Sequence, residues 1–195
     1  MRKVVAQAFV TLDGFTAGPN GETDWQLHGF SEEMGEYIYE TYEEADLLLL
    51  GKYTYLQFEA YWQHQSNNPE ADRMNNTAKI VCSTTLPSAN WSNTILVKSN
   101  VAAEIRALKN KPGKNMMIVG SVGLMQSLAQ QDLIDEYRFL TYPVFLGAGR
   151  RLLDNIRETR QLELMYSRIF TNGVMLTIYR PSQRICLYEY LAAVK

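Results

Sequence analysis

The feature that most constrains the fold is the alternation of strand and helix signals in the segment 118–153, IVGSVGLMQSLAQQDLIDEYRFLTYPVFLGAGRRLL. A short apolar strand ends at Val119, and the glycine turn 120–123 opens a helix that runs to about Gln131. A second strand follows at 136–142. Such alternation predicts a parallel sheet, because each helix carries the chain back along one face of the sheet.

The same alternation covers the rest of the chain. The predicted strands are 4–11, 47–50, 79–82 and 94–97, and the predicted helices are 31–44, 52–62 and 101–110. Polar residues at 12–29 and 63–77 predict two long loops. Two runs, 162–170 and 174–179, flank Thr171-Asn-Gly and predict a closing hairpin. The sequence therefore predicts an α/β fold with a mixed, mostly parallel sheet and a C-terminal antiparallel hairpin.

The composition is that of one globular domain. Of 195 residues, 46% are hydrophobic and 21% are charged, which is enough apolar material for a core. The formal net charge is −2 and no long basic run occurs, so neither nucleic acid nor an anionic membrane is expected as a partner. No apolar run approaches the roughly 20 residues that span a bilayer. With no export signal in the sequence, we expect a cytoplasmic protein.

The residues that bind metals in other proteins are sparse. Cys82 and Cys186 lie far apart and fit no metal-binding spacing, so we expect reduced thiols. His28 and His64 are the two histidines, and neither has a second ligand at metal spacing. We therefore expect no metal site.

Three predicted strands end in residues that suit a phosphate. Gly51-Lys52 follows a continuous apolar strand, Ser83-Thr-Thr follows the next, and Gly120-Ser-Val-Gly opens a helix. Glycine lets the backbone approach a ligand, and the free N–H groups of a helix N-terminus attract anions. Each turn alone is more often merely structural. The turns match neither a Gly-x-Gly-x-x-Gly fingerprint nor a Walker A loop, and Gly147-Ala-Gly lacks the third glycine.

The order of these motifs resembles the dihydrofolate reductase-like superfamily, in the branch of the C-terminal reductase domain of the riboflavin-biosynthesis deaminase-reductase (RibD). The resemblance spans about residues 3–180. The segments that carry it are Thr11-Leu-Asp-Gly, Gly51-Lys-Tyr-Thr-Tyr, Val81-Cys-Ser-Thr-Thr-Leu, Trp91-Ser-Asn, Ile118-Val-Gly-Ser, Leu133-Ile-Asp-Glu-Tyr-Arg and Pro143-Val-Phe-Leu-Gly-Ala-Gly. The resemblance implies a three-layer α-β-α domain that binds NADPH and passes hydride to a C=N or C=O bond.

The resemblance also assigns a cofactor site. It implies that the adenosine-side phosphates and ribose lie against the first two turns and the pyrophosphate against the third. The implied cofactor-binding residues are Gly51, Lys52, Thr54, Ser83, Thr84, Gly120, Ser121, Val122, Gly123 and Leu124. The family often has arginine where this chain has Lys52. Lysine neutralises a phosphate but cannot grip it with two parallel hydrogen bonds, which weakens the preference for NADPH over NADH.

The substrate side is implied by the loop that follows the first strand. Asp13, Asp24 and Trp25 are the candidate substrate-binding residues, with the two carboxylates orienting a heterocycle and the indole packing beside the nicotinamide. Asp13 and Glu33 are the candidate catalytic residues. The alternative for Asp13 is a turn residue, for Asp24 a solvated loop charge, and for Glu33 an ordinary acidic residue at a helix start.

Two classes of function remain open from the sequence. The first is an NADPH-dependent reductase of a pterin-like or ribityl- or ribosylaminopyrimidine substrate, as in riboflavin biosynthesis. The second is a non-catalytic or altered-function protein on the same fold that binds a nucleotide or a flavin. A purely structural dimer would leave the three glycine turns unexplained.

The last part of the chain predicts self-association. Residues 1–180 are assigned to the reductase-like domain, and 181–195 to a C-terminal extension of that domain. The segment 185–194 is apolar and rich in tyrosine, and it follows the predicted hairpin. Together they offer more apolar edge than a monomer usually exposes, so we expect a homodimer.

Overall fold

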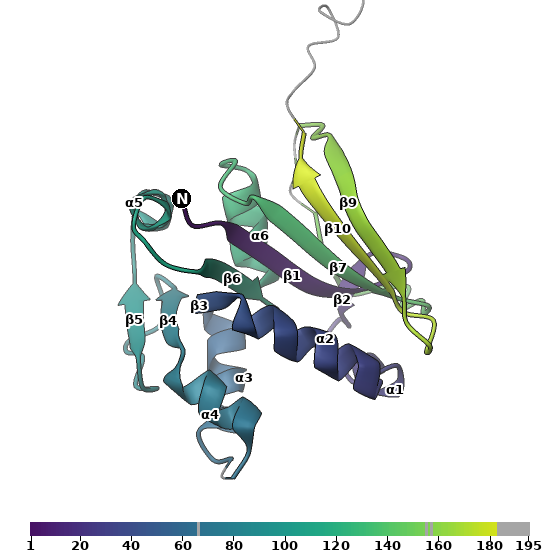
Figure 1. Ribbon diagram of the computed structural model, residues 1–195, viewed down its shortest axis with the longest axis horizontal. Coiled ribbons are helices and arrows are strands. Elements are labelled where there is room, and N and C mark those ends of the chain that lie inside the picture. Colours follow the sequence, from purple (N-terminus) through teal and green to yellow (C-terminus); the bar gives the residue numbers. More distant parts are fainter. Residues whose placement is uncertain (66, 155, 157, 183–195) are drawn as a thin grey trace, which may run out of the picture.

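The computed structural model describes residues 1–182 apart from 66, 155 and 157. Its central element is a sheet with the strand order β5-β4-β3-β6-β1-β7-β10-β9 (Figure 1). The strands of this sheet are β1 Val4–Thr11, β3 Ala45–Gly51, β4 Ala78–Cys82, β5 Thr94–Val97, β6 Asn115–Val119, β7 Glu136–Tyr142, β9 Leu162–Ile169 and β10 Met175–Pro181. A small second sheet pairs β2 (Phe15–Ala17) with β8 (Arg150–Arg151).

Strand β1 lies in the middle of the sheet and is parallel to both of its neighbours. Val4 pairs with Met116 of β6, and Ala6 pairs with Tyr137 of β7. The antiparallel strands come at the end, where β10 pairs with β7 and β9 pairs with β10. The predicted α/β fold, with a mixed, mostly parallel sheet and a C-terminal hairpin, is confirmed.

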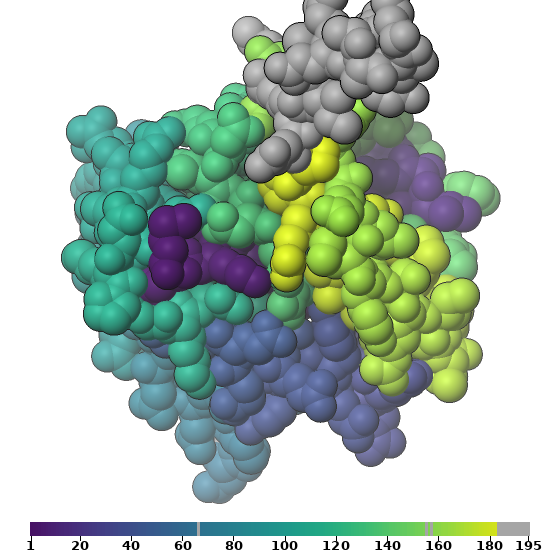
Figure 2. Space-filling view, turned by 45° about the horizontal axis from the view of Figure 1, so that its top comes forward, coloured from purple at the N-terminus to yellow at the C-terminus, as the bar shows by residue number. Residues whose placement is uncertain are grey.

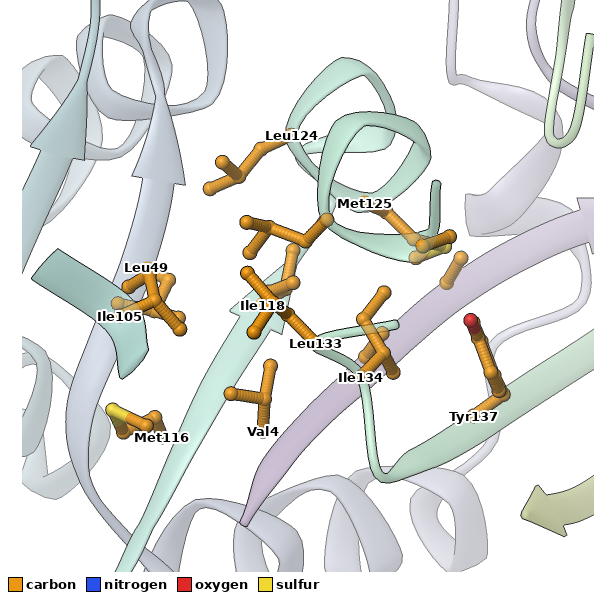
Figure 3. Close-up of a cluster of buried hydrophobic side chains, with 14 of the residues drawn as sticks. Val4, Leu49, Ile105, Met116, Ile118, Leu124, Met125, Leu133, Ile134 and Tyr137 are labelled. Carbon is orange, nitrogen blue, oxygen red and sulfur yellow. The ribbon is translucent and has the colours of Figure 1, made fainter. Parts of the chain in front are cut away.

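Helices cover both faces of the sheet and give three layers (Figure 1). They are α1 Trp25–His28, α2 Glu32–Glu43, α3 Lys52–Trp62, α4 Pro69–Asn76, α5 Val101–Lys109 and α6 Val122–Ala129. Figure 3 shows Met125 of α6 and Ile105 of α5 gathered around Val4 and Ile118, which all lie in one buried cluster. On the opposite face of the sheet, Leu48 of β3 belongs to a second buried cluster, together with Tyr55 of α3 and Met74 of α4.

The segment 63–77 corrects the sequence-based prediction of a continuous polar loop, since it contains α4. Asn68 begins this helix, because its side chain accepts hydrogen bonds from the backbone N–H groups of Glu70 and Ala71. Pro69 stands at the first helical position, where no backbone donor is needed. Only two positions of the helix, Ala71 and Met74, are buried, so its apolar stripe is too narrow to stand out in the sequence.

The long loop predicted at 12–29 also contains short elements. Its start forms β2, which pairs with β8 across a wide gap in the sequence, and its end forms the single turn of α1. In Gly149, before β8, an added Cβ would lie 2.1 Å from the carbonyl oxygen of Ala17. Glycine is therefore required there by the close approach of the two loops.

Two features are absent from the described part of the chain. None of its helices combines the length and the apolar character that crossing a bilayer requires. In the same residues, no group of three or more histidine, cysteine or acidic side chains is placed to bind a metal ion.

Candidate functional site

A large cavity lies over the second half of β1 and the carboxyl end of β6, on the face of the sheet that α2, α3 and α4 cover. Its volume is about 1050 Å³, at the upper end of the range for small-molecule sites. Gln7 and Phe9 of β1 line the cavity, together with Val119 at the end of β6. Ligands bind at this edge of open α/β sheets.

Two of the predicted glycine turns meet beside the cavity. The backbone N–H of Gly51 donates to Ser121 Oγ over 2.9 Å, which ties the end of β3 to the turn after β6. Gly120 has a φ of +60°, and a Cβ there would lie 3.4 Å from Thr54 Cγ2. The positive φ and the close approach both favour glycine.

The helices that start at these turns have uncapped N-termini. Neither Gly51, before α3, nor Ser121, before α6, caps its helix with a side chain. The first N–H groups of a helix lack intrahelical partners, and together with the helix dipole they attract an anion. Two adjacent N-termini of this kind fit a pyrophosphate, and Arg150, which lines the cavity and lies close to Gly123, adds positive charge.

The predicted cofactor residues divide around these turns. Thr54, Gly120 and Val122 line the cavity, whereas Gly51 and Ser121 form the hydrogen bond that links the turns. The last two predicted residues, Gly123 and Leu124, differ in their exposure to solvent. Gly123 is exposed, whereas Leu124 is buried in the core cluster under α6.

Lys52, Ser83 and Thr84 are not among the residues that line the cavity. Lys52 Nζ donates to Thr85 Oγ1 over 3.3 Å and so joins the turns after β3 and β4. Ser83 Oγ accepts hydrogen bonds from the backbone N–H groups of Thr85 and Leu86, which fixes its own turn. Thr84 is exposed. Their contact with a nucleotide stays a prediction.

The carboxylate of Asp13 is occupied by the protein itself. It accepts hydrogen bonds from the backbone N–H groups of Leu146 (3.1 Å) and Gly147 (2.7 Å) and from Thr11 Oγ1 (2.5 Å). Burial raises the pKa of Asp13, but the hydrogen bonds from Thr11, Gly147 and Leu146 outweigh it and lower that pKa below 3.8. These contacts hold the loop after β7, a structural role between distant segments that differs from the local turn left open as the alternative. Substrate contact by Asp13 stays a prediction that its existing partners do not favour.

The other candidate substrate and catalytic residues lie outside the cavity lining. Trp25 is buried against the ring of Tyr142, with centroids 5.1 Å apart, because α1 closes the core over β7 and β10. Asp24 is exposed and precedes α1. Glu33 pairs with Arg168 and accepts hydrogen bonds from Thr171, so it fastens α2 to the β9–β10 hairpin. The hydrogen bond from the Thr171 backbone and the pairing with Arg168 lower the pKa of Glu33.

The sequence reading missed Gln7. This residue lies in the middle of β1, is 2% exposed and lines the cavity. Its Oε1 is buried and has no hydrogen-bond partner within the described residues. Leaving a buried polar group unpaired costs about 1–3 kcal/mol. Because Gln7 also lines the cavity, its oxygen is in a position for a ligand to pair. The available signal was one amide side chain in the otherwise apolar run Val4–Val10.

Comparison with known proteins agrees with this geometry. The family model of the RibD C-terminal domain matches residues 2–176. The chain belongs to the RibD C-terminal domain family. This confirms the resemblance on which the sequence analysis relied.

Individual proteins match this chain over most of their length. The uncharacterized protein YyaP of Bacillus subtilis (strain 168) is 28% identical over 185 residues, which are 91% of this chain and 94% of YyaP. The structure of a Shewanella sp. PV-4 protein named for riboflavin biosynthesis superposes with a TM-score of 0.77 at 22% identity, covering 93% of this chain and 99% of that one. Dihydrofolate reductase from Enterococcus faecalis, solved with NADP(H), superposes at 0.60 and 12% identity, with 93% and 97% covered. The fold is that of NADPH-dependent reductases.

Proposed function

We propose that this protein is an NADPH-dependent reductase that passes hydride to a C=N or C=O bond of a pyrimidine-containing heterocycle, pterin-like or a ribityl- or ribosylaminopyrimidine as in riboflavin biosynthesis. The observation that carries the proposal is the meeting of two uncapped helix N-termini beside one large cavity. Membership of the RibD C-terminal domain family supports it, and so does the unpartnered amide at Gln7.

Different residues would bind the cofactor and orient the substrate. The turns at Gly51 and Gly120 would bind the pyrophosphate of the cofactor, with Lys52 and Arg150 supplying charge. NADPH supplies the hydride. Gln7 would orient the heterocycle, because its amide can accept from a ring N–H and donate to a ring carbonyl.

The proton would come from water. The lining residues of α2 are Gly35, Ile38, Tyr39 and Tyr42, so no carboxylate of that helix faces the cavity. Hydride transfer does not require a strong acid in the site when water can deliver the proton.

Activity is tested by following NADPH oxidation through the absorbance of the nicotinamide. The purified protein would be mixed with NADPH and, in turn, with oxidised pterins and with 5-amino-6-(5-phosphoribosylamino)uracil. The open-chain form of this ribosylamine carries a reducible C=N bond. Oxidation that depends on both enzyme and heterocycle supports a reductase. Tight NADPH binding with no turnover on any of them contradicts it.

The alternative is a protein that binds a nucleotide or a flavin without catalysis. The lack of a carboxylate from α2 in the cavity favours this alternative over a reductase with a built-in acid. One assay distinguishes the two functions. Both predict saturable binding of a nucleotide, but only the reductase consumes NADPH.

We also propose a homodimer formed through β9. Among the described residues this strand ends the sheet order, so one of its edges has backbone groups that no described strand pairs. It lies at the outer surface in Figure 2 and exposes Leu162, Leu164 and Ile169. A second copy can pair with such an edge around a twofold axis. The segment 185–194, which also motivated the prediction, lies outside the described residues.

Light scattering at micromolar concentration tests the dimer. We expect twice the chain mass of 22.3 kDa for the natural protein and the single mass for Leu164→Lys, because a charge would be buried in the contact. Leu12→Lys is the control, since Leu12 is 59% exposed against 53% for Leu164 and does not belong to β9. A single mass for the natural protein contradicts the proposal.

A further inference from the structure

One end of the cavity is walled by aromatic rings, away from the glycine turns. We call it the aromatic end. It consists of Tyr39 and Tyr42 of α2, Phe58, Tyr61 and Trp62 of α3, and Arg73 and Met74 of α4. The rings of Tyr61 and Trp62 meet edge to face with centroids 4.8 Å apart. Such walls favour a flat ring, because aromatic pairs add to the gain from burying apolar area.

Apart from Arg73, the polar groups of the aromatic end carry no charge. Trp62 Nε1 is buried and has no acceptor within the described residues. Burial raises the pKa of the Tyr42 phenol, with Glu70 adding to the effect, so this group stays neutral. Both groups can accommodate a ring that carries a carbonyl or a ring nitrogen, and neither offers charge.

The one cation of the aromatic end shares its charge with a carboxylate, although its Nε is buried without a hydrogen-bond partner among the described residues. Arg73 forms an ion pair with Glu43, and its guanidinium lies 4.9 Å from the ring centroid of Tyr39. Glu70 lines the cavity beside it and would repel an anion. Arg150, the other cation among the lining residues, lies close to Gly123 at the turn after β6. A phosphate at the aromatic end would therefore meet one guanidinium that is already paired with Glu43 and the carboxylate of Glu70 beside it, so its charge would be poorly compensated and burying it would be costly.

We propose that the aromatic end binds an uncharged, flat aromatic part of the substrate, so that the substrate is a fused-ring heterocycle and not a phosphoribosyl pyrimidine. This inference rests on the proposed function, since it assumes that Gln7 meets the pyrimidine part of the same molecule. The single cavity joins Gln7 to the aromatic end, and its volume of about 1050 Å³ holds a ring system beside the nicotinamide. The substrate class is thereby narrowed to pterin-like or flavin-like compounds.

A pair of probes tests the inference on the natural protein. Lumazine and lumichrome share a pyrimidinedione fused to a pyrazine, and lumichrome carries an additional dimethylbenzene ring. Their binding would be measured by fluorescence with saturating NADP⁺, which permits no hydride transfer. We expect lumichrome to bind at least about tenfold more tightly, because its extra ring is buried among aromatic side chains. Equal affinity, tighter lumazine binding or no binding of either compound overturns the inference.

A matched pair of variants locates the extra ring. Tyr61 lines the aromatic end and is 55% exposed, whereas Tyr166 of β9 is 50% exposed and does not line the cavity. Tyr61→Leu should reduce the preference for lumichrome at least about threefold, since it removes an aromatic wall. Tyr166→Leu should leave it unchanged. An equal effect of both variants contradicts the assignment.

A competition experiment with a phosphate-bearing compound tests whether the aromatic end excludes a phosphate. We expect 5-amino-6-(5-phosphoribosylamino)uracil not to displace lumichrome at equal concentration. Displacement by this compound, but not by inorganic phosphate alone, overturns the proposal. Failure of the proposed function is distinct, because it shows as a lack of NADP⁺ binding in the same titration, before any heterocycle is added.

Discussion

Gln7 and Asp13 are two polar residues near each other in sequence whose side chains differ in their hydrogen bonds. Gln7 lies inside β1 and Asp13 follows that strand by two residues. The carboxylate of Asp13 accepts three hydrogen bonds from Thr11, Leu146 and Gly147, whereas Gln7 Oε1 has none within the described residues. The comparison shows that the protein itself uses the carboxylate of Asp13, whereas the amide oxygen of Gln7 is left for a ligand in the cavity to pair.

The largest effect expected on the ligand side is that of Gly120→Val. A branched side chain at a φ of +60° is strained and fills the space beside Thr54, so NADPH affinity should fall at least about a hundredfold. The control is Gly173→Val, whose φ is +83° and which lies in the hairpin turn beside Pro143. Nicotinamide fluorescence measures both. Equal loss in the two variants would mean that strain, and not the cofactor, explains the result.

Gln7→Leu should separate binding from stability. We expect lumazine affinity to fall about tenfold, because an amide hydrogen bond to the ring is lost. The melting temperature should stay the same or rise, since an unpaired buried oxygen is replaced by an apolar group. Fluorescence titration and thermal denaturation provide the two readings. A lower melting temperature with unchanged affinity would assign Gln7 to the core.

Asp13→Asn should have the opposite pattern, with lower stability and almost unchanged ligand affinity. It should lower the melting temperature, because one of the acceptors that hold Leu146 and Gly147 becomes an amide donor. Affinity for NADPH should change by less than about twofold.

The pH dependence of the Asp13 effect follows from its lowered pKa. A carboxyl with a lower pKa in the folded state stabilises the fold above its ordinary value of 3.8, and this contribution is lost as the pH falls through the folded value. The difference in stability between the natural protein and Asp13→Asn should therefore shrink below about pH 4. A difference that is constant from pH 3 to pH 7, or roughly so, contradicts the charge-based account.

The smallest effect is expected for Lys52→Ala. Lys52 is partly exposed and contacts Thr85, so salt and water screen its charge. NADPH affinity should fall about threefold to fivefold, and the loss should disappear at high ionic strength. Lys98→Ala is the control, since Lys98 Nζ donates to the carbonyl of Pro87 and does not line the cavity. Titrations at two salt concentrations measure both.

The fold could be predicted because its signals are local. Apolar runs such as Leu47–Leu50 and the glycine turn at 120–123 fix strands and helix starts within a few residues. The link between Gly51 and Ser121 follows from parallel strands ending at one edge. The helix α4 escaped because only two of its side chains are buried.

The substrate side could not be predicted from the sequence, because it depends on contacts between distant segments. Asp13 is paired with residues more than 130 positions away, and Glu33 with a hairpin just as distant. A carboxylate in a loop has the same appearance in a sequence whether or not such partners exist. The cavity beside Gln7 is likewise formed by residues of many elements packed together, among them β1, α2 and α3.

The central claim is that the two turns at Gly51 and Gly120 form a cofactor site, and a direct titration with NADPH and NADH tests it. Nicotinamide fluorescence would be followed as each compound is added to the natural protein. The account predicts saturable NADPH binding that Gly120→Val abolishes and Gly173→Val preserves. If neither compound binds to the folded natural protein, the cofactor site proposed here does not exist.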